Sequence, residues 1–194
     1  RSSFEVVLEE LAVKIIHLTL CLSLVFGVQS YAVDSSLFFD GVENIESLSF
    51  EDGSTYRGQV GACPLKPRCM QGVGIYTKKD SQYFGVFEAN KPSGEGLFVF
   101  ENGQSYEGNF MDGMLHGKGV MTYPDGRLYE GDFKNNQRNG FGVMIYQDGG
   151  KYSEGSRYEG GWRDDKRHGK GVMIYPNDSR RLIGEFRDDI FIGG

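Results

Sequence analysis

Two histidines are the first candidates for chemistry in this sequence, because imidazole serves both acid–base catalysis and metal binding near neutral pH. His116 and His168 each precede a Gly-x-Gly stretch, and Asn139 occupies the equivalent position between them. If the three positions belong to successive β-units, the two histidines lie about 20 Å apart, too far to share one metal ion. We therefore interpret both as recurring structural positions and predict no metal site.

A row of glutamates is the second candidate. Glu107, Glu130 and Glu159 each follow a tyrosine at one recurring position. Paired catalytic carboxylates need unlike environments, whereas regular recurrence indicates one solvated face of a sheet. The sequence also has no dinucleotide-binding or phosphate-binding glycine motif and no hydrolase nucleophile motif. We predict that the chain is not an enzyme, with no catalytic residue and no cofactor.

Two cysteines, Cys63 and Cys69, lie close together in "CPLKPRC". A lone pair with no second pair and no nearby histidine makes a poor zinc site. The two side chains close a small surface loop as a disulfide if the domain lies in an oxidising compartment, and are free thiols otherwise. The sequence leaves both alternatives open.

Composition narrows the class of protein. The chain has 194 residues, enough for one ordinary domain plus a small addition. Its 27 acidic and 21 basic residues give a formal net charge of -6, which argues against a nucleic-acid partner. Glycine is abundant at 29 residues while proline is scarce at 5, and this combination favours ordered, glycine-punctuated β-structure.

A hydrophobic segment precedes the rest of the chain. Residues 15–33 contain no Asp, Glu, Lys or Arg over 19 residues, close to the roughly 20 that a helix needs to cross a bilayer. We favour a retained single-pass anchor over residues 1–33, followed by a linker over 34–47. A cleavable signal peptide ending near "SYA" at 30–32 and a buried amphipathic helix are the alternatives.

Flanking charges predict the orientation of this anchor. Arg1 and Lys14 precede the segment, and no Lys or Arg follows it before Arg57. The positive-inside rule places the repeat domain on the translocated side, in an organelle lumen, a periplasm-like space or the exterior. A first residue other than methionine suggests a targeting peptide already removed, and therefore an organelle membrane. A translocated domain would also permit the Cys63–Cys69 disulfide.

The rest of the sequence repeats. Successive copies of one motif begin at Tyr83, Tyr106, Tyr129 and Tyr158. The first two steps are 23 residues and the third is 29, with the additional residues in a loop around "GKYSEGSR". Weaker copies start at Tyr56 and Leu182. We predict an array over residues 48–194, with about five full units and partial ends.

Each unit has the alternation of two short strands. Tyr106, Gly108 and Phe110 alternate with polar residues, as do Gly117 and Gly119 in the second half of the unit. "MDGMLH" is the predicted turn between the strands, and "PDG" leads into the next unit. The fold is therefore predicted to be mainly β, an elongated antiparallel meander preceded by one hydrophobic, membrane-crossing helix.

Glycine weakens a strand, so its recurrence there indicates positions where a side chain would collide with an aromatic ring. Stacked or edge-on ring pairs contribute about 0.5–1.5 kcal/mol each beyond burial. We predict that this aromatic and glycine register holds the sheet together. The structural residues are Tyr83, Gly85, Phe87, Tyr106, Gly108, Phe110, Tyr129, Gly131, Phe133, Tyr158, Gly160 and Trp162.

The pattern YEGxFxxxxxHGxGxxxYxDG resembles the MORN repeat. The resemblance covers Tyr56 to Gly194, with departures at the cysteine-bearing insertion, at Val60 in place of an aromatic residue, and at Ser93 and Asn139 in place of histidine. It implies a hairpin array that serves as a scaffold, membrane-association or dimerisation module. Such arrays also accompany catalytic domains in some lipid kinases and protein methyltransferases.

We therefore expect a non-enzymatic, membrane-anchored accessory subunit that docks protein partners in a larger membrane complex. A peripheral phospholipid-binding adaptor, a secreted repeat protein and a regulatory module for an enzyme on another chain are the alternatives. Phospholipid headgroups are the less favoured partner, because surrounding aspartates leave no net basic excess near the C-terminus. The basic residues concerned are Lys166, Arg167, Arg180 and Arg181.

Overall fold

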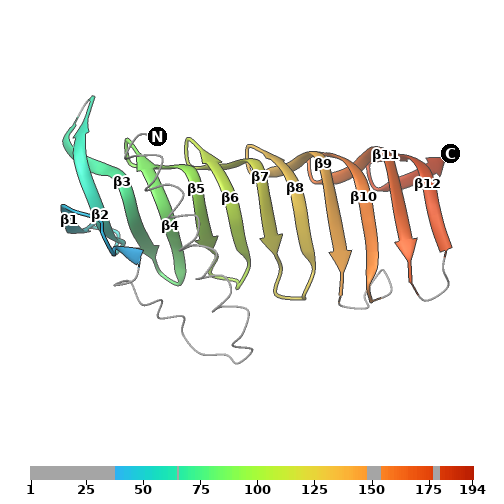
Figure 1. Ribbon diagram of the computed structural model, residues 1–194, viewed down its shortest axis with the longest axis horizontal. Helices are drawn as coiled ribbons and strands as arrows, with labels where there is room; N and C mark the ends of the chain where they lie inside the picture. Colours follow the sequence, from blue (N-terminus) through green and yellow to red (C-terminus); the bar gives the residue numbers. More distant parts are fainter. Residues whose placement is uncertain (1–37, 65, 148–153, 177–179) are drawn as a thin grey trace. The chain divides into compact units, whose positions relative to one another are not determined.

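The computed structural model describes residues 38–64, 66–147, 154–176 and 180–194. Within these ranges, thirteen strands form one antiparallel sheet in which each strand pairs with the next along the chain (Figure 1). The predicted mainly-β meander is confirmed. The predicted hydrophobic helix over residues 15–33 lies outside the described residues. Inside them, no helix is long and apolar enough to cross a membrane.

The strands follow one another through short connections. Their bounds are β1 (Ile45–Ser49), β2 (Thr55–Cys63), β3 (Lys66–Lys78), β4 (Ser81–Glu88), β5 (Lys91–Val99), β6 (Ser105–Met111), β7 (Met114–Thr122), β8 (Leu128–Lys134), β9 (Gln137–Tyr146), β10 (Ser156–Arg163), β11 (Lys166–Tyr175), β12 (Arg180–Arg187) and β13 (Ile190–Gly193). The chain divides into two compact parts, the first ending at Leu97 and the second beginning at Phe98.

Glycines pair across the sheet in both parts. In the first part Gly58 lies opposite Gly74, which lies opposite Gly85. In the second part the same register gives one continuous row of glycines, each opposite the next across neighbouring strands. The row consists of Gly108, Gly119, Gly131, Gly142, Gly160, Gly171 and Gly184.

In each hairpin from β2–β3 to β10–β11, a tyrosine ring packs against the two paired glycines. A Cβ added to Gly171 would lie 2.7 Å from a ring carbon of Tyr158, and one added to Gly160 would lie 2.7 Å from its hydroxyl oxygen. Real Cβ atoms do not approach other heavy atoms so closely. The row of glycines is therefore the space into which the tyrosines pack, as the sequence predicts.

Two-residue turns close the hairpins at one end of the strands. We use the word edge for such a line of strand ends, and not for an outermost strand. Asp164 and Asp165 have φ of 49° and 66°, and Asn135 and Asn136 have φ of 50° and 70°. Positive φ at both central residues is the conformation that matches the twist of paired strands, and Asn and Asp tolerate it. The predicted turn over residues 111–116 is thus too wide.

The strands resume sooner than expected because this turn needs only two central residues. The turn after β6 consists of Asp112 and Gly113, and β7 already begins at Met114. His116 consequently lies inside β7 rather than in the turn. Gly117, with φ of 65°, follows it where the pairing of β6 with β7 shifts between Gly108 and Phe110. This irregularity is a β-bulge, which bends a strand.

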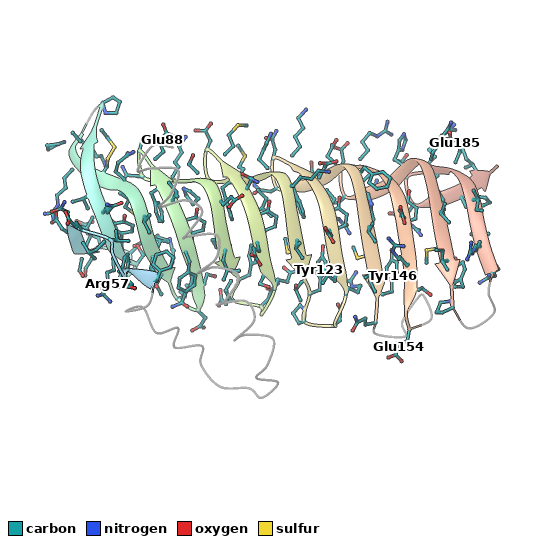
Figure 2. The ribbon with its side chains drawn as sticks, viewed as in Figure 1. Arg57, Glu88, Tyr123, Tyr146, Glu154 and Glu185 are labelled. Carbon is teal, nitrogen blue, oxygen red and sulfur yellow. A yellow bond between two sulfur atoms is a disulfide. The ribbon has the colours of Figure 1, made fainter. Side chains whose placement is uncertain are left out.

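Longer loops occupy the opposite edge, apart from the two-residue turn of Lys79 and Asp80 between β3 and β4. In the loop after β7, the Asp125 side chain accepts a hydrogen bond from the Arg127 backbone N–H at 3.1 Å. Asn102 and Asp52 make the same bond, to Gln104 and Ser54. Figure 2 shows Tyr123 and Tyr146 at this edge of the second part, and Glu185 toward the edge with the short turns.

Gly108→Val tests the steric role of the glycine row. The new side chain would begin 2.5 Å from the Gly119 Cα and 2.7 Å from the Tyr106 hydroxyl oxygen, so strands or ring must move apart. We expect a loss of about 3 kcal/mol in the free energy of unfolding, measured by denaturant titration.

His116→Asn is the matched control, because Asn139 occupies the equivalent position naturally. We expect the free energy of unfolding to change by less than about 0.5 kcal/mol. Equal damage from the two substitutions would contradict a structural role for the glycine and a replaceable role for the histidine.

Candidate functional site: the two faces of the sheet

The face that carries the recurring tyrosines, here called the ladder face, is buried. Tyr106, Tyr129 and Tyr158 are fully covered, and Tyr56 and Tyr83 expose only 1% of their surface. Each hydroxyl donates a hydrogen bond to the carbonyl three residues later, as Tyr158 does to Gly161 at 3.0 Å. Burial raises the pKa of Tyr158 to about 12 and those of the other four further.

Rings on this face contact both their own unit and the next. Tyr129 meets Phe133 of the same strand edge to face, at 5.1 Å between ring centroids. It also meets Trp162 of the following unit, at 5.2 Å and an interplanar angle of 83°. Tyr106 with Phe133 and Tyr158 with Phe186 repeat the second contact. The ladder therefore joins each unit to its neighbour through aromatic pairs.

A second set of contacts joins units at the edge with the short turns. The second turn residue of one hairpin bonds a residue of the second strand in the preceding hairpin, which is the second residue of β7, β9 or β11 and the fifth residue of β3. The Asn136 backbone N–H donates to the Leu115 carbonyl at 3.1 Å, and its side-chain oxygen accepts from the Leu115 N–H at 2.9 Å. We call this two-bond arrangement a turn clamp. Asp165 with Arg138, Asp189 with Arg167 and Asn90 with Met70 repeat it.

Two turn clamps also hold an arginine over the ladder. The Arg138 guanidinium lies 4.5 Å from the Trp162 ring centroid, and its Nε donates to the Asp165 carboxylate at 2.9 Å. Arg167 bonds Asp189 in the same way, at 3.0 Å, and exposes only 5% of its surface. These arginines cap the aromatic ladder rather than face the solvent.

A family model for the MORN repeat matches four stretches of the chain, residues 83–105, 106–126, 129–151 and 158–180. The chain is a MORN-repeat protein. A comparison with curated proteins finds no match. The weaker units that the sequence predicts from Tyr56 and Leu182 lie outside these four stretches, but the first shares their tyrosine and glycine packing.

The histidine position of these MORN repeats contacts the first turn residue of the next unit. His168 Nδ1 lies 3.6 Å from the Asp188 carboxylate, and the Asn139 side chain donates to Asp164 at 3.4 Å. Nδ1 of His116 is buried, with no hydrogen-bond partner among the described residues. Among the residues that the structure describes, no group of three or more metal-ligating side chains lies together.

Cys63 and Cys69 are joined in a disulfide at the tip of the β2–β3 hairpin, with their Cα atoms 6.1 Å apart. The insertion that departs from the MORN pattern is thus a cross-linked extension of one hairpin. The basic residues near the C-terminus differ among themselves, because Arg167 is buried while Lys166, Arg180 and Arg181 are exposed. Arg180 lies 4.2 Å from the Tyr175 ring centroid.

The opposite face of the sheet, here called the reverse face, is less covered. In the second part its central row alternates acidic and branched apolar side chains in register across the strands. Glu130 is exposed, Val143 and Val172 are half-buried, and Ile183 exposes 62% of its surface. The row consists of Glu107, Val120, Glu130, Val143, Glu159, Val172 and Ile183.

In the first part the reverse face carries other residues and is covered by the chain itself. Arg57 and Phe84 occupy the positions after Tyr56 and Tyr83 where later MORN repeats have glutamate. Phe38 and Phe39, from the predicted linker, pack there and expose 1% and 8% of their surface. Phe38 lies 6.0 Å from Phe84 edge to face, and the Arg57 guanidinium lies 5.0 Å from the Phe39 ring.

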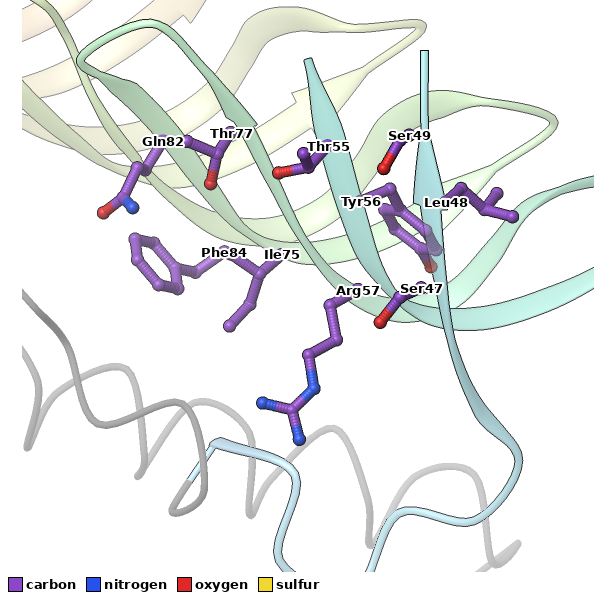
Figure 3. Close-up of a pocket in the computed structure, with 10 residues that line it drawn as sticks. All are labelled: Ser47, Leu48, Ser49, Thr55, Tyr56, Arg57, Ile75, Thr77, Gln82 and Phe84. Carbon is purple, nitrogen blue, oxygen red and sulfur yellow. The ribbon is translucent and has the colours of Figure 1, made fainter. Parts of the chain in front are cut away.

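A hollow adjoins this contact in the first part. Arg57, Ile75 and Phe84 point to the same side of the sheet, and hydroxyl side chains of the neighbouring row line the rest (Figure 3). Sequence reasoning missed both this docking and the turn clamps. The clamps had a signal, since Asn or Asp recurs at positions 90, 136, 165 and 189, but the pair Phe38 and Phe39 stands outside the repeat.

Asp165→Gly tests the turn clamp without straining the turn, because Gly113 occupies the equivalent position naturally. The substitution removes the carboxylate that accepts from the backbone N–H and from Nε of Arg138, a mostly buried side chain, and leaves the bond from its Nη2 to the carbonyl of residue 165. We expect a loss of about 2 kcal/mol in the free energy of unfolding, measured by denaturant titration.

The double variant Arg138→Leu with Asp165→Asn should restore the clamp, because it reproduces Leu115 with Asn136. We expect it to unfold within about 1 kcal/mol of the parent chain. A double variant less stable than Asp165→Gly would show that the clamp does not stabilise the array.

Alkaline unfolding tests the buried ladder tyrosines. A tyrosine in the unfolded chain ionises with a pKa of about 10, below the folded-state pKa of Tyr158 at about 12. The stability from each is fully present below about pH 10 and is lost as pH rises through its folded-state pKa. The loss is up to about 1.4 kcal/mol per pH unit and tyrosine.

We expect phenolate absorbance and β-sheet circular dichroism to change in one cooperative transition above pH 10. Tyr158→Phe should lower the number of protons released in that transition by one. Phenolate formation by the ladder tyrosines in a sheet that remains folded would contradict their burial.

Proposed function

We propose that this chain is a non-enzymatic scaffold that binds protein partners through the reverse face of its second part. MORN repeats suggest a protein involved in binding or interaction. The observation that supports the binding face is the contrast between the two surfaces, because the ladder face is filled by its own rings while Phe141 and Ile183 on the reverse face expose 53% and 62%. Contiguous exposed apolar side chains mark interaction surfaces, and Phe141 and Ile183 line one hollow.

Protein partners are favoured over lipid headgroups by the charges of the same region. Arg138 and Arg167, two of the cations that headgroups would need, are bonded to Asp165 and Asp189 and lie over aromatic rings. The reverse face itself carries a glutamate in each of three successive repeats. Anionic lipid surfaces attract segments with a net basic excess, which this face does not have.

We further propose that residues 15–33 tether this scaffold to a membrane, as a structural or accessory subunit of a larger complex. The support is their uncharged, apolar sequence and the basic residues that precede them. On this proposal the repeat array lies on the translocated side, where the Cys63–Cys69 disulfide is stable.

Native mass measurement of the full chain, extracted from its membrane in mild detergent, tests this function. We expect a complex that contains other proteins and that resists washing with alkaline carbonate, whereas a variant lacking residues 15–33 should be released by the wash. A stable monomer without partners would contradict the scaffold, and release of the full chain would contradict the tether alone.

A further inference from the structure

The first part of the chain shows what the reverse face can hold. Phe38 and Phe39 lie on it beside Phe84 and Arg57, and both phenylalanines are buried. When an apolar ring packs on a sheet, apolar surface of both the ring and the sheet is removed from water. At about 25 cal/mol per Å² of apolar surface buried, this contact is favourable. The reverse face of this sheet is therefore able to take aromatic side chains from a segment outside the repeats.

In the second part the same face has the opposite charge at the equivalent positions. Glu130 and Glu159 stand where the first part has Arg57 and Phe84. Asp40 immediately follows the two phenylalanines, so the chain's own segment would bring a carboxylate toward these glutamates. Like charges placed together weaken binding and select against a partner. The change from Arg57 and Phe84 to glutamate therefore disfavours residues 38–40, from this chain or a second copy, as the occupant.

The charges of the second part are also unevenly distributed along the face. Over β6–β9 the face carries three carboxylates, Glu107, Glu130 and Asp132, against one lysine, Lys118, which pairs with Asp132 at 2.8 Å. Over β10–β12, Arg157 pairs with Glu159 at 2.9 Å, and Lys170, Arg181 and Glu185 add two positive charges and one negative charge. The face is therefore acidic over β6–β9 and close to balanced over β10–β12.

An apolar hollow lies at the balanced end. Phe141, Val172 and Ile183 line it, with the backbone of Gly160 and Gly171 between them and the charged side chains of Glu159, Lys170 and Glu185 at its rim. Phe141 is the middle residue of a Gly-x-Gly stretch in which Lys118 and Lys170 stand in neighbouring repeats. The exposed ring is thus peculiar to this repeat and not required by the register.

The occupant must satisfy its own backbone. The reverse face presents side chains, and its backbone groups are already paired between strands, so an extended segment laid on it would leave polar groups without partners. A helix pairs its backbone internally and packs well on a sheet. From Glu130 on β8 to Val172 and Ile183 on β11 and β12 is three to four strands. That span is about 14–19 Å, or roughly 10–13 residues of helix.

We propose that the reverse face of the second part binds an amphipathic helix of a protein partner, with Lys or Arg over Glu130. About three turns further along, large apolar or aromatic residues of the helix fill the hollow at Phe141, Val172 and Ile183. This inference rests on the proposed scaffold function and adds the chemistry and orientation of the partner.

Photo-crosslinking in the cells that make the protein tests the proposal. In the full chain, benzoylphenylalanine replaces Val143, which lies in the middle of the central row of the reverse face. This row is called the strip. Glu154, an exposed residue of the loop before β10, is the comparison position. We expect Val143 to link a protein segment whose sequence predicts an amphipathic helix with basic residues separated from an apolar cluster by about 10–13 residues.

Charge reversal at one glutamate separates binding from folding. Glu130→Lys should lower the yield of the Val143 crosslink at least tenfold while the thermal unfolding transition stays unchanged. Glu154→Lys, the matched control outside the strip, should leave the yield unaltered. A crosslink that survives Glu130→Lys would overturn the assigned chemistry, as would one to lipid, to an acidic segment or to a second copy.

The remaining outcomes distinguish this inference from the function on which it rests. Protein linked at Glu154 but not at Val143 would leave the scaffold in place and remove the reverse face as its binding surface. If no protein is linked at either position and the native mass is that of a monomer, both the helix-binding inference and the scaffold function would be wrong.

Discussion

The packing of a tyrosine ring against a pair of cross-strand glycines is the constraint on which this sheet depends. A single-layered sheet has no second layer to cover it, so each unit must supply its own cover. Tyr106 does this by lying over Gly108 and Gly119, and its hydroxyl group is satisfied by the Asn109 carbonyl. The ring can then meet Phe133 of the next unit edge to face. Glycine costs strand stability, but at these positions any larger residue would remove the cover.

Because the ladder face is consumed by its own rings, recognition falls to the other surface and to the residues that vary there. The position after each tyrosine is free of the packing constraint, and it changes from Arg57 and Phe84 to glutamate along the chain. Arg57 and Phe84 contact the chain's own Phe39 and Phe38, whereas glutamate at the same position disfavours that segment. One scaffold geometry thus supports different surface chemistry in successive repeats, which is the general logic of repeat proteins.

Sequence reasoning recovered the meander and the aromatic and glycine register because both follow from a period of two within a period of 23 residues. Turn width was missed, since six residues between recognisable strands fit several turn types, and positive φ at Asp112 appears only in the backbone. Phe38 and Phe39 could not be placed, because they belong to no repeat. Arg167 was counted among the basic surface residues near the C-terminus, although Arg138 and Arg167 recur at one position of the repeat and so indicated a shared structural role.

The turn clamps run in one direction along the chain. Asn136 secures Leu115, Asp165 secures Arg138 and Asp189 secures Arg167, so in each case the later hairpin completes the earlier one. During synthesis on the ribosome, a hairpin would therefore emerge without the two clamp bonds at its short-turn edge. It would gain them only when the turn of the following hairpin had left the exit tunnel. The repeat length then sets the delay between the formation of a unit and its consolidation. Assembly of the sheet is in this sense a vectorial process, paced by translation.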